Sequence, residues 1–252
     1  MTSHPWHVTP IQRVCDFWIK RDDHFVFAGV SGGKARACYF LACKERTGLI
    51  TAGSRHSPQL GIVSHIARSM KLKCRVHTST GGQTPELMDA RAQGATHIAH
   101  RAGYNSVIIA RARDDAIRRG WTEIPFGMEC KDAIEGTAHQ TQNLPKKAKR
   151  LVVPVGSGMT LAGILEGMNR YKFELPVLGI TVGADPVDRL DKWCPQGWRK
   201  RVKLIRHELK YDRSARHASI DRISLDPLYE AKCIDFLLPG DCFWIVGNRK
   251  TR

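Results

Sequence analysis

The chain has 252 residues and 42% hydrophobic content, enough for one large domain or two small ones with a sizeable core. The formal net charge of +16 implies a positive potential that attracts nucleic acid or other polyanions. No stretch resembles a transmembrane helix or a signal peptide, which excludes those classes, and we expect a cytoplasmic protein. The eight cysteines are scattered without a C-x-x-C pair, so neither a metal site nor a disulfide framework is predicted.

The N-terminal part contains an apolar run and a glycine-rich start of a helix. Phe25–Ala28 predicts an early strand, and Gly32-Gly33-Lys34-Ala35-Arg36 then opens a helix. Lys34 therefore lies at a helix N-terminus, where the helix dipole and the neighbouring Arg36 disfavour its charged form. A reactive neutral amine is one interpretation of Lys34, and a solvent-facing lysine is the alternative.

Residues 49–127 alternate between short apolar runs and helical patterns. The runs predict four strands, Leu49–Ala52, Cys74–Thr78, Thr96–Ala99 and Thr122–Pro125. Apolar residues at three- and four-residue spacing predict three helices, Gly61–Met70, Pro85–Gln93 and Ser106–Arg119. This order is typical of a βαβ array with parallel strands. The polar turn after the first strand contains His56, which is interpreted either as a base or as a solvated loop residue.

Residues 151–163 combine a buried strand, a glycine-rich turn and the start of a helix. Leu151–Val155 is apolar throughout and predicts a parallel strand. Gly156 and Gly158 allow a positive φ and a close approach to a ligand, while the N–H groups of the first helical turn and the Thr160 hydroxyl point outward. Such a turn can hold a phosphate, although strand-glycine-helix turns are also ordinary connections in α/β proteins.

The remaining segments alternate between apolar elements and charged stretches. Helices are predicted near Glu135–Gln142 and from Asp226-Pro227 to Leu238, and strands at Pro176–Val182 and Phe243–Val246. Residues 184–222 are highly charged and predict a helix with a basic face or a partly mobile segment. Basic residues concentrate in three runs, Arg111–Arg119, Lys146–Arg150 and Arg199–Lys210.

Five motifs occur in the order found in one enzyme family. They are Gly32-Gly33-Lys34-Ala35-Arg36, Ser57-Pro58-Gln59-Leu60-Gly61, Gly156-Ser157-Gly158-Met159-Thr160, Asp226-Pro227-Leu228-Tyr229-Glu230 and Phe243-Trp244-Ile245-Val246-Gly247-Asn248. Together they resemble the pyridoxal-phosphate enzymes of fold type II, the tryptophan-synthase-β superfamily. Within it the chain resembles the branch of 1-aminocyclopropane-1-carboxylate deaminase and D-cysteine desulfhydrase.

The resemblance implies an α/β fold of two domains with pyridoxal 5'-phosphate between them. Both domains are expected to have parallel or mostly parallel sheets flanked by helices. A small βαβ domain, residues 45–127, is expected as an insertion in a large cofactor-binding domain, residues 1–44 and 128–252. The interval between Gly183 and Asp226 is shorter than is usual in this family.

The resemblance also implies roles for individual residues. Lys34 is expected to bind the cofactor covalently and, with Ser57 and Tyr229, to handle protons in catalysis. The other expected cofactor-binding residues are Gln59, Gly156, Ser157, Gly158, Met159, Thr160 and Glu230. Glu230 is expected beside the pyridine nitrogen, because the side chain of Val246 cannot form a hydrogen bond there. The alternative for Glu230 is a first-turn helix residue that the helix dipole stabilises.

The implied activity is pyridoxal-phosphate-dependent lyase, deaminase or decarboxylase chemistry at the α-carbon of an amino acid group. Because an enzyme for free amino acids has no need of a charge of +16, the hypothesis for the substrate is an amino acid attached to a modified DNA base, such as a viral hypermodified thymine. Two alternatives stay open: an enzyme for a free small amino acid, and a non-catalytic nucleic-acid-binding protein that has kept the fold. A homodimer and no membrane partner are expected.

Overall fold

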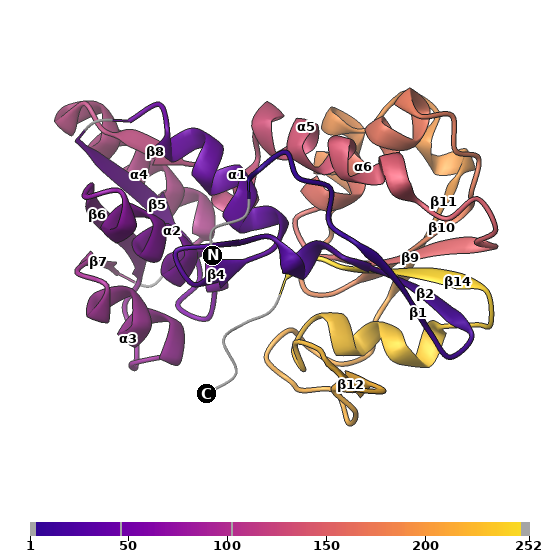
Figure 1. The fold of residues 1–252 in the computed structure, drawn as a ribbon. Coiled ribbons are helices and arrows are strands. Elements are labelled where there is room, and N and C mark those ends of the chain that lie inside the picture. The colour runs from indigo at the N-terminus through magenta and orange to yellow at the C-terminus, as the bar shows by residue number, and fades with distance from the viewer. Residues whose placement is uncertain (1–3, 46, 102, 248–252) are drawn as a thin grey trace. The chain divides into compact units, whose positions relative to one another are not determined.

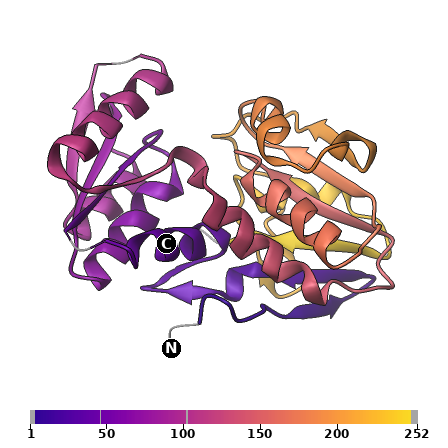
Figure 2. The ribbon, with the colours of Figure 1, turned by 90° about the horizontal axis from the view of Figure 1, so that it is seen from above.

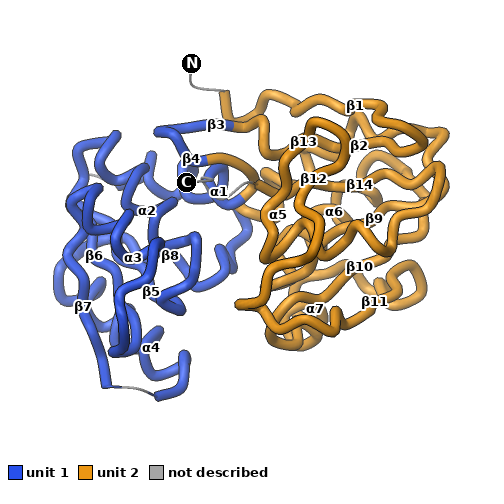
Figure 3. The backbone as a smooth tube through the Cα atoms, turned by 90° about the horizontal axis from the view of Figure 1, so that it is seen from below, with its two compact units in different colours: residues 1–3, 26–30, 34–132 blue, residues 4–25, 31–33, 133–252 orange. Residues whose placement is uncertain are grey.

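The computed structural model describes residues 4–45, 47–101 and 103–247, which fall into two compact units (Figure 3). The described part of unit 1 comprises residues 26–30 and 34–132, and that of unit 2 comprises residues 4–25, 31–33 and 133–247. Each unit has its own sheet (Figure 1). The mixed α/β architecture with parallel sheets and flanking helices confirms the predicted fold class. The predicted boundaries of a cofactor-binding domain stay a prediction.

Unit 1 is built on a four-stranded parallel sheet in the order β7-β6-β5-β8. Its strands are β5 (Gly48–Ala52), β6 (Lys73–Ser79), β7 (Thr96–His100) and β8 (Thr122–Ile124). Its helices are α1 (Gly33–Ala42), α2 (Pro58–Ser69), α3 (Pro85–Ala92), α4 (Asn105–Arg119) and the 3-10 helix η2 (Phe126–Met128). The predicted βαβ array is therefore present.

Polar caps determine where two helices of unit 1 begin. The hydroxyl of Ser57 accepts a hydrogen bond from the N–H of Gln59 at the start of α2, and Thr84 does the same for Leu87 in α3. A proline follows each cap, where its missing N–H costs the helix nothing. These Ser-Pro and Thr-Pro pairs place both helices directly after the loops at the carboxyl ends of β5 and β6.

Unit 2 is built on a six-stranded sheet in the order β1-β2-β14-β9-β10-β11. Its strands are β1 (Ile11–Val14), β2 (Phe17–Arg21), β9 (Arg150–Val155), β10 (Val177–Thr181), β11 (Val202–Arg206) and β14 (Asp241–Ile245). The β1 and β2 strands are antiparallel, whereas every other neighbouring pair runs parallel. The parallel strands therefore share one edge at which all of them end.

Helices and short hairpins complete the chain. They are η1 (Asp22–His24), α5 (Lys131–His139), η3 (Gln140–Asn143), α6 (Met159–Arg170), α7 (Val187–Trp193), η4 (Trp198–Lys200) and η5 (Glu230–Phe236). Two two-stranded sheets are formed by β3 (Val26–Phe27) with β4 (Val30–Ser31) and by β12 (Ser219–Ile220) with β13 (Ile223–Ser224). Figure 2 views unit 2 from above, with the magenta α5 and the salmon-coloured α6 in front of the strands.

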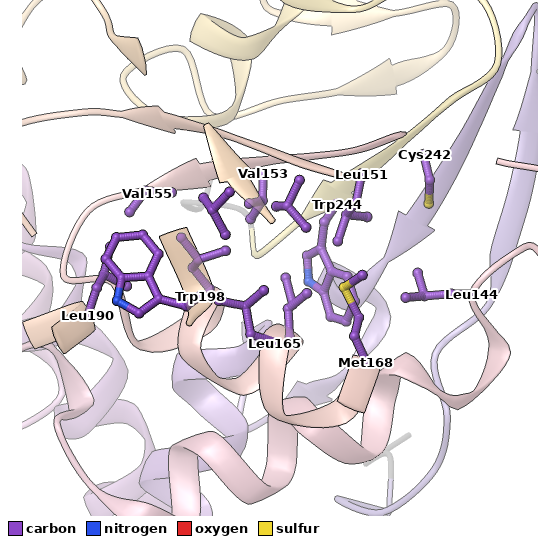
Figure 4. Close-up of a cluster of buried hydrophobic side chains, with 14 of the residues drawn as sticks. Leu144, Leu151, Val153, Val155, Leu165, Met168, Leu190, Trp198, Cys242 and Trp244 are labelled. Atoms are coloured by element: carbon purple, nitrogen blue, oxygen red, sulfur yellow. The ribbon is translucent and has the colours of Figure 1, made fainter. Parts of the chain in front are cut away.

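The core of unit 2 has one layer on each face of the sheet, because successive side chains of a strand point to opposite faces. On one face Leu151, Val153 and Val155 pack with the apolar side of α6 (Figure 4). On the other face Val152 packs with residues of η5 and of the β12-β13 hairpin. Each large side chain buried in these layers contributes about 1.5 to 3 kcal/mol. This packing fixes the ends of β9 and β14, which carry the loops described below.

Two segments differ from the expectations. Residues 184–222 were expected to form a helix with a basic face or a partly mobile segment; they contain the short helices α7 and η4 and, in addition, the edge strand β11, which pairs in parallel with β10. The apolar residues Val202, Leu204 and Ile205 form this strand although charged residues surround them, since an edge strand buries little of its surface. The predicted strand at Phe25–Ala28 is reduced to Val26–Phe27, because Ala28 and Gly29 adopt positive φ values and turn the chain.

Within the described residues, each helix is too short or too polar to cross a membrane.

Candidate active site

The glycine-rich loop of unit 2 connects the end of β9 to the start of α6. Gly158 has φ of +87°, a conformation that favours glycine, and a Cβ there would lie 2.9 Å from Cδ2 of Leu190. Its carbonyl accepts the N–H of Ala162 at 2.9 Å, so the helix begins at this residue. The N–H groups of the first turn have no partner within the helix and are free to bind an anion. Met159 buries its side chain, so it offers only its backbone to such an anion.

Tyr229 lies directly against this loop. Its hydroxyl donates a hydrogen bond to the carbonyl of Pro154 at 3.3 Å, and a Cβ on Gly156 would lie 3.0 Å from its Oη. Burial raises the pKa of Tyr229 well above its usual value, and the nearby Glu230 and Tyr211 act in the same direction. The phenol therefore keeps its proton at neutral pH and is a donor at this position.

The carboxyl group of Glu230 is fully buried and forms no ion pair in the described part of the chain. Its Oε1 accepts the N–H of Gly247 at 3.1 Å, whereas Oε2 is buried without a hydrogen-bond partner among the same residues. Burial, and then the charge of Asp226, raise the pKa of Glu230 well above its usual range. A buried carboxyl oxygen left unpaired costs about 1 to 3 kcal/mol, so Oε2 is a strong candidate for binding a ligand atom.

The segment that leads to Lys34 is held against the end of β14. The N–H of Gly33 donates to the carbonyl of Val246 at 2.9 Å, and a Cβ on Gly32 would lie only 2.1 Å from the same oxygen. Gly32 also has φ of +86°, so only glycine fits. Lys34 follows Gly33 directly, which places its Cα about 3.8 Å from that of Gly33. The contacts of Gly32 and Gly33 therefore fix the backbone of unit 2 up to the residue before Lys34.

Besides Lys34, two predicted site residues belong to unit 1. Ser57 caps α2 and accepts one hydrogen bond, which leaves its hydroxyl proton for another acceptor. Gln59 is buried, and its amide donates to the Thr51 hydroxyl at 2.9 Å and to the Pro125 carbonyl at 2.8 Å. Its Oε1 accepts the N–H of Gly127 at 3.0 Å. The amide of Gln59 thus joins α2 to the residues after β8, and both of its N–H groups are already used.

The parallel topology brings the predicted residues of unit 2 to one edge of its sheet. The loop Gly156–Gly158 follows β9, and Val246–Gly247 follows the neighbouring β14. Tyr229 contacts the first loop, and Glu230 contacts the second. The structure adds Asp22, which the sequence analysis did not select: its buried Oδ2 would lie 3.1 Å from a Cβ on Gly33. The acidic pair Asp22-Asp23 directly after β2 is the signal that could have indicated it.

Solved structures with the same architecture exist. The chain is similar to the crystal structure of an ACC deaminase homologue, with a TM-score of 0.77, 20% identity, and coverage of 96% of this chain and 89% of that one. A threonine deaminase from T.th. has a TM-score of 0.71 at 18% identity, over 98% of this chain and 94% of that one. The chain has the fold of the fold type II pyridoxal-phosphate enzymes.

A third similar structure is a pyridoxal 5'-phosphate-dependent aspartate racemase, with a TM-score of 0.68, 14% identity, and coverage of 97% of this chain and 91% of that one. No protein-family model matches the sequence, and no curated protein is similar to it. The fold type II likeness therefore comes from the structure and from the motifs of the sequence.

Proposed function

We propose that this chain is a pyridoxal-phosphate-dependent enzyme that acts at the α-carbon of an amino acid group by lyase or deaminase chemistry. The observation that carries the proposal is the buried, unpaired Oε2 of Glu230 in a fold type II architecture. A pyridine nitrogen is a ligand atom that would satisfy this oxygen. The similar structures include deaminases, an ammonia-lyase and racemases, which supports chemistry at an amino acid.

The proposed cofactor residues match the parts of this cofactor. The N–H groups at the start of α6, with Ser157 and Thr160, would bind its phosphate, since a helix N-terminus with a glycine turn attracts an anion. The side chain of Met159 is buried and takes no part. Lys34 would hold the cofactor covalently through its amine. Gln59 stays a predicted cofactor residue, although its N–H groups are bound within unit 1.

When bound, the cofactor supplies an electron sink that weakens the bonds of the substrate α-carbon. The protein residues would then move protons and orient the bond to be broken. Because Oε1 of Glu230 accepts the Gly247 N–H, the proton of the neutral acid lies on Oε2. Glu230 can share that proton with a ring nitrogen. Tyr229 keeps its proton and would act as a donor, while Ser57 and Lys34 are the proposed groups that accept and return protons.

The experiment for this proposal uses the full chain with added pyridoxal phosphate. We expect a visible absorbance band from the lysine-bound cofactor, and reduction with borohydride followed by peptide mapping should find the label on Lys34. Lys34→Ala should abolish the band. Lys44→Ala is the matched control, because Lys44 is exposed and pairs with Asp132 at 3.2 Å. A chain that gives no band with excess cofactor, or a label on another lysine, would overturn the assignment.

We also propose, as in the sequence analysis, that the amino acid group is attached to a DNA base. The positions of the basic residues indicate where a DNA strand could bind in unit 2. In unit 2 the run Lys146–Arg150 leads into β9, of which Arg150 is the first residue, and Arg199–Arg201 precede β11. Both therefore lie at the amino ends of parallel strands, at the edge opposite the glycine loop. Arg206 ends β11 and Lys210 follows it, at the carboxyl edge. Of these three groups, the last supports a polyanionic substrate near the proposed cofactor residues of unit 2. A free small amino acid remains the alternative substrate.

A further inference from the structure

A pocket of about 580 Å³ lies within unit 1, outside the proposed cofactor site. It is bounded by α4 on one side and by β6 and β7 on the other. The strand β7 is at the edge of the sheet, and α4 packs mainly on β5 and β6, so the face of β7 toward α4 is left partly uncovered. The polar part of the lining consists mainly of three arginines, two histidines and an aspartate: Arg75, Arg111, Arg118, His77, His100 and Asp115.

Two histidines and an aspartate in the lining of this pocket are joined in series by hydrogen bonds. Nε2 of His77 lies 3.2 Å from Oδ2 of Asp115, and its Nδ1 lies 2.9 Å from Nε2 of His100. Burial lowers the pKa of His77 to about 4 although Asp115 opposes this shift, so the ring is neutral at pH 7. Burial and the charge of Arg111 also lower the pKa of His100.

The hydrogen bonds from Asp115 to His77 and on to His100 determine the tautomers of the two histidines. The carboxylate of Asp115 can only accept, so His77 carries its hydrogen on Nε2, and its Nδ1 accepts from His100. His100 then carries its hydrogen on Nε2, and its Nδ1 is left as an acceptor. That nitrogen has no hydrogen-bond partner within the described ranges. The pocket therefore presents a neutral acceptor that requires a ligand with a hydrogen to donate.

Positive charge exceeds negative charge around the same pocket. The carboxylate of Asp115 is shared by Arg75 at 2.6 Å, Arg119 at 3.0 Å and Arg118 at 3.6 Å. Arg111 is exposed, has no ion pair in the described part of the chain, and lies near enough to His100 to lower its pKa. Asp114 is the other acid in the lining. Three arginines of the lining, with Arg119 beside it, thus outnumber two carboxylates, and a guanidinium is the group best suited to bind a phosphate.

We propose that this pocket binds a phosphate monoester. Its anionic oxygens would pair with Arg111 and Arg118, and a hydroxyl of its carbon part would donate to Nδ1 of His100. A terminal phosphate carries close to two negative charges at neutral pH, whereas an internal phosphodiester carries one, so the excess of arginines favours a terminal phosphate, either of a small molecule or of the 5' end of a strand. Ile98 and Ile117 in the lining offer apolar contacts to the carbon part of the ester. The volume lies within the range typical of small-ligand pockets.

The test is calorimetric titration of the full chain at constant ionic strength. The probes are a nucleoside 5'-monophosphate, the unphosphorylated nucleoside, and two short oligonucleotides with and without a 5'-phosphate. We expect the monophosphate to bind and the nucleoside not to bind. Of the two oligonucleotides, binding of the phosphorylated one alone would extend the site to strand ends; the failure of both would restrict it to small esters. Equal binding of both oligonucleotides would overturn the preference for a terminal phosphate.

Matched variants locate the site. Arg111→Met should weaken binding by about tenfold or more, since it removes a charge-assisted hydrogen bond. Arg113→Met is the control, because Arg113 is on the same helix but pairs with Glu123 at 3.1 Å outside the pocket. His100→Leu should weaken binding similarly. Unchanged affinity in Arg111→Met and His100→Leu would overturn the proposal. The visible band of the bound cofactor should be the same in all of these variants, so a failure here is distinguishable from a failure of the proposed function.

Discussion

Gly158 offers a direct test of the proposed phosphate loop. The substitution Gly158→Ala places a Cβ on a residue with φ of +87° and within 2.9 Å of Cδ2 of Leu190. The left-handed backbone costs a non-glycine residue about 1 to 2 kcal/mol. The crowding against Leu190 adds about 1 to 3 kcal/mol if the neighbour cannot move. We therefore expect the free energy of unfolding to fall by about 2 to 5 kcal/mol.

The matched control is Gly197→Ala in the same unit. Gly197 has φ of +78°, but a Cβ there would meet no atom within 4 Å. Gly197→Ala should therefore lower the free energy of unfolding only by the cost of the left-handed backbone, about 1 to 2 kcal/mol. For a chain of this size each kcal/mol shifts the melting temperature by about 2 to 4 °C, so thermal unfolding separates the two variants.

Cofactor affinity gives the second measurement for this pair. Moving the start of α6 should misalign its first N–H groups, and losing one charge-assisted hydrogen bond weakens binding by roughly tenfold to a hundredfold. Gly158→Ala should therefore bind pyridoxal phosphate more weakly than Gly197→Ala, as measured by absorbance titration. If the two variants had the same stability and the same cofactor affinity, the assignment of the loop would be refuted.

Three further substitutions test other contacts. Burial raises the pKa of Glu230 well above the unfolded value of 4.5, so the folded apo chain binds this proton more tightly than the unfolded chain does. The free energy of unfolding therefore falls as pH rises above 4.5. Glu230→Gln should remove that fall, as measured by urea unfolding at pH 5 and 7. Asp115→Asn should destabilise the chain by about 1 to 3 kcal/mol at pH 7, since it removes the carboxylate that Arg75 and His77 share, and a difference near zero in chemical unfolding would contradict this. Gly32→Ala should yield little folded protein in a solubility assay, because its Cβ would lie 2.1 Å from the carbonyl oxygen of Val246; a normal yield would show that this backbone can move apart.

The βαβ part of the fold could be predicted because its signals are local. A cap such as Ser57 with Pro58, and a helix stop such as Gly120 with φ of +61°, act within a few residues of the elements they delimit. The strand β11 could not be predicted in the same way. Its apolar residues are few and lie among charges, and only its pairing with β10 makes the segment a strand.

For the candidate site too, the sequence indicated residues but not their tertiary contacts. Motif and spacing selected Glu230, but its burial and its unpaired Oε2 arise from residues distant in sequence, among them Gly247. The sequence also suggested Gln59 as a cofactor residue, whereas its hydrogen bonds to Thr51 and Pro125 depend on how α2 packs on β5. The hydrogen-bond chain from Asp115 through His77 to His100 joins three elements, so no local pattern could indicate it.

The placement of charge in unit 2 separates two ways in which DNA could interact with this chain. Lys146 and Lys147 are exposed at the amino edge of the sheet, whereas Arg206 is exposed at the carboxyl edge, where the glycine loop lies. A strand bound at the amino edge would not bring a base to that loop, because the sheet separates the two edges. If the substrate is carried on DNA, Arg206→Gln should lower turnover of an amino-acid-modified oligonucleotide, and the double variant Lys146→Gln with Lys147→Gln should lower only the salt-sensitive affinity. The reverse pattern would make DNA a surface partner and favour a free amino acid as the substrate.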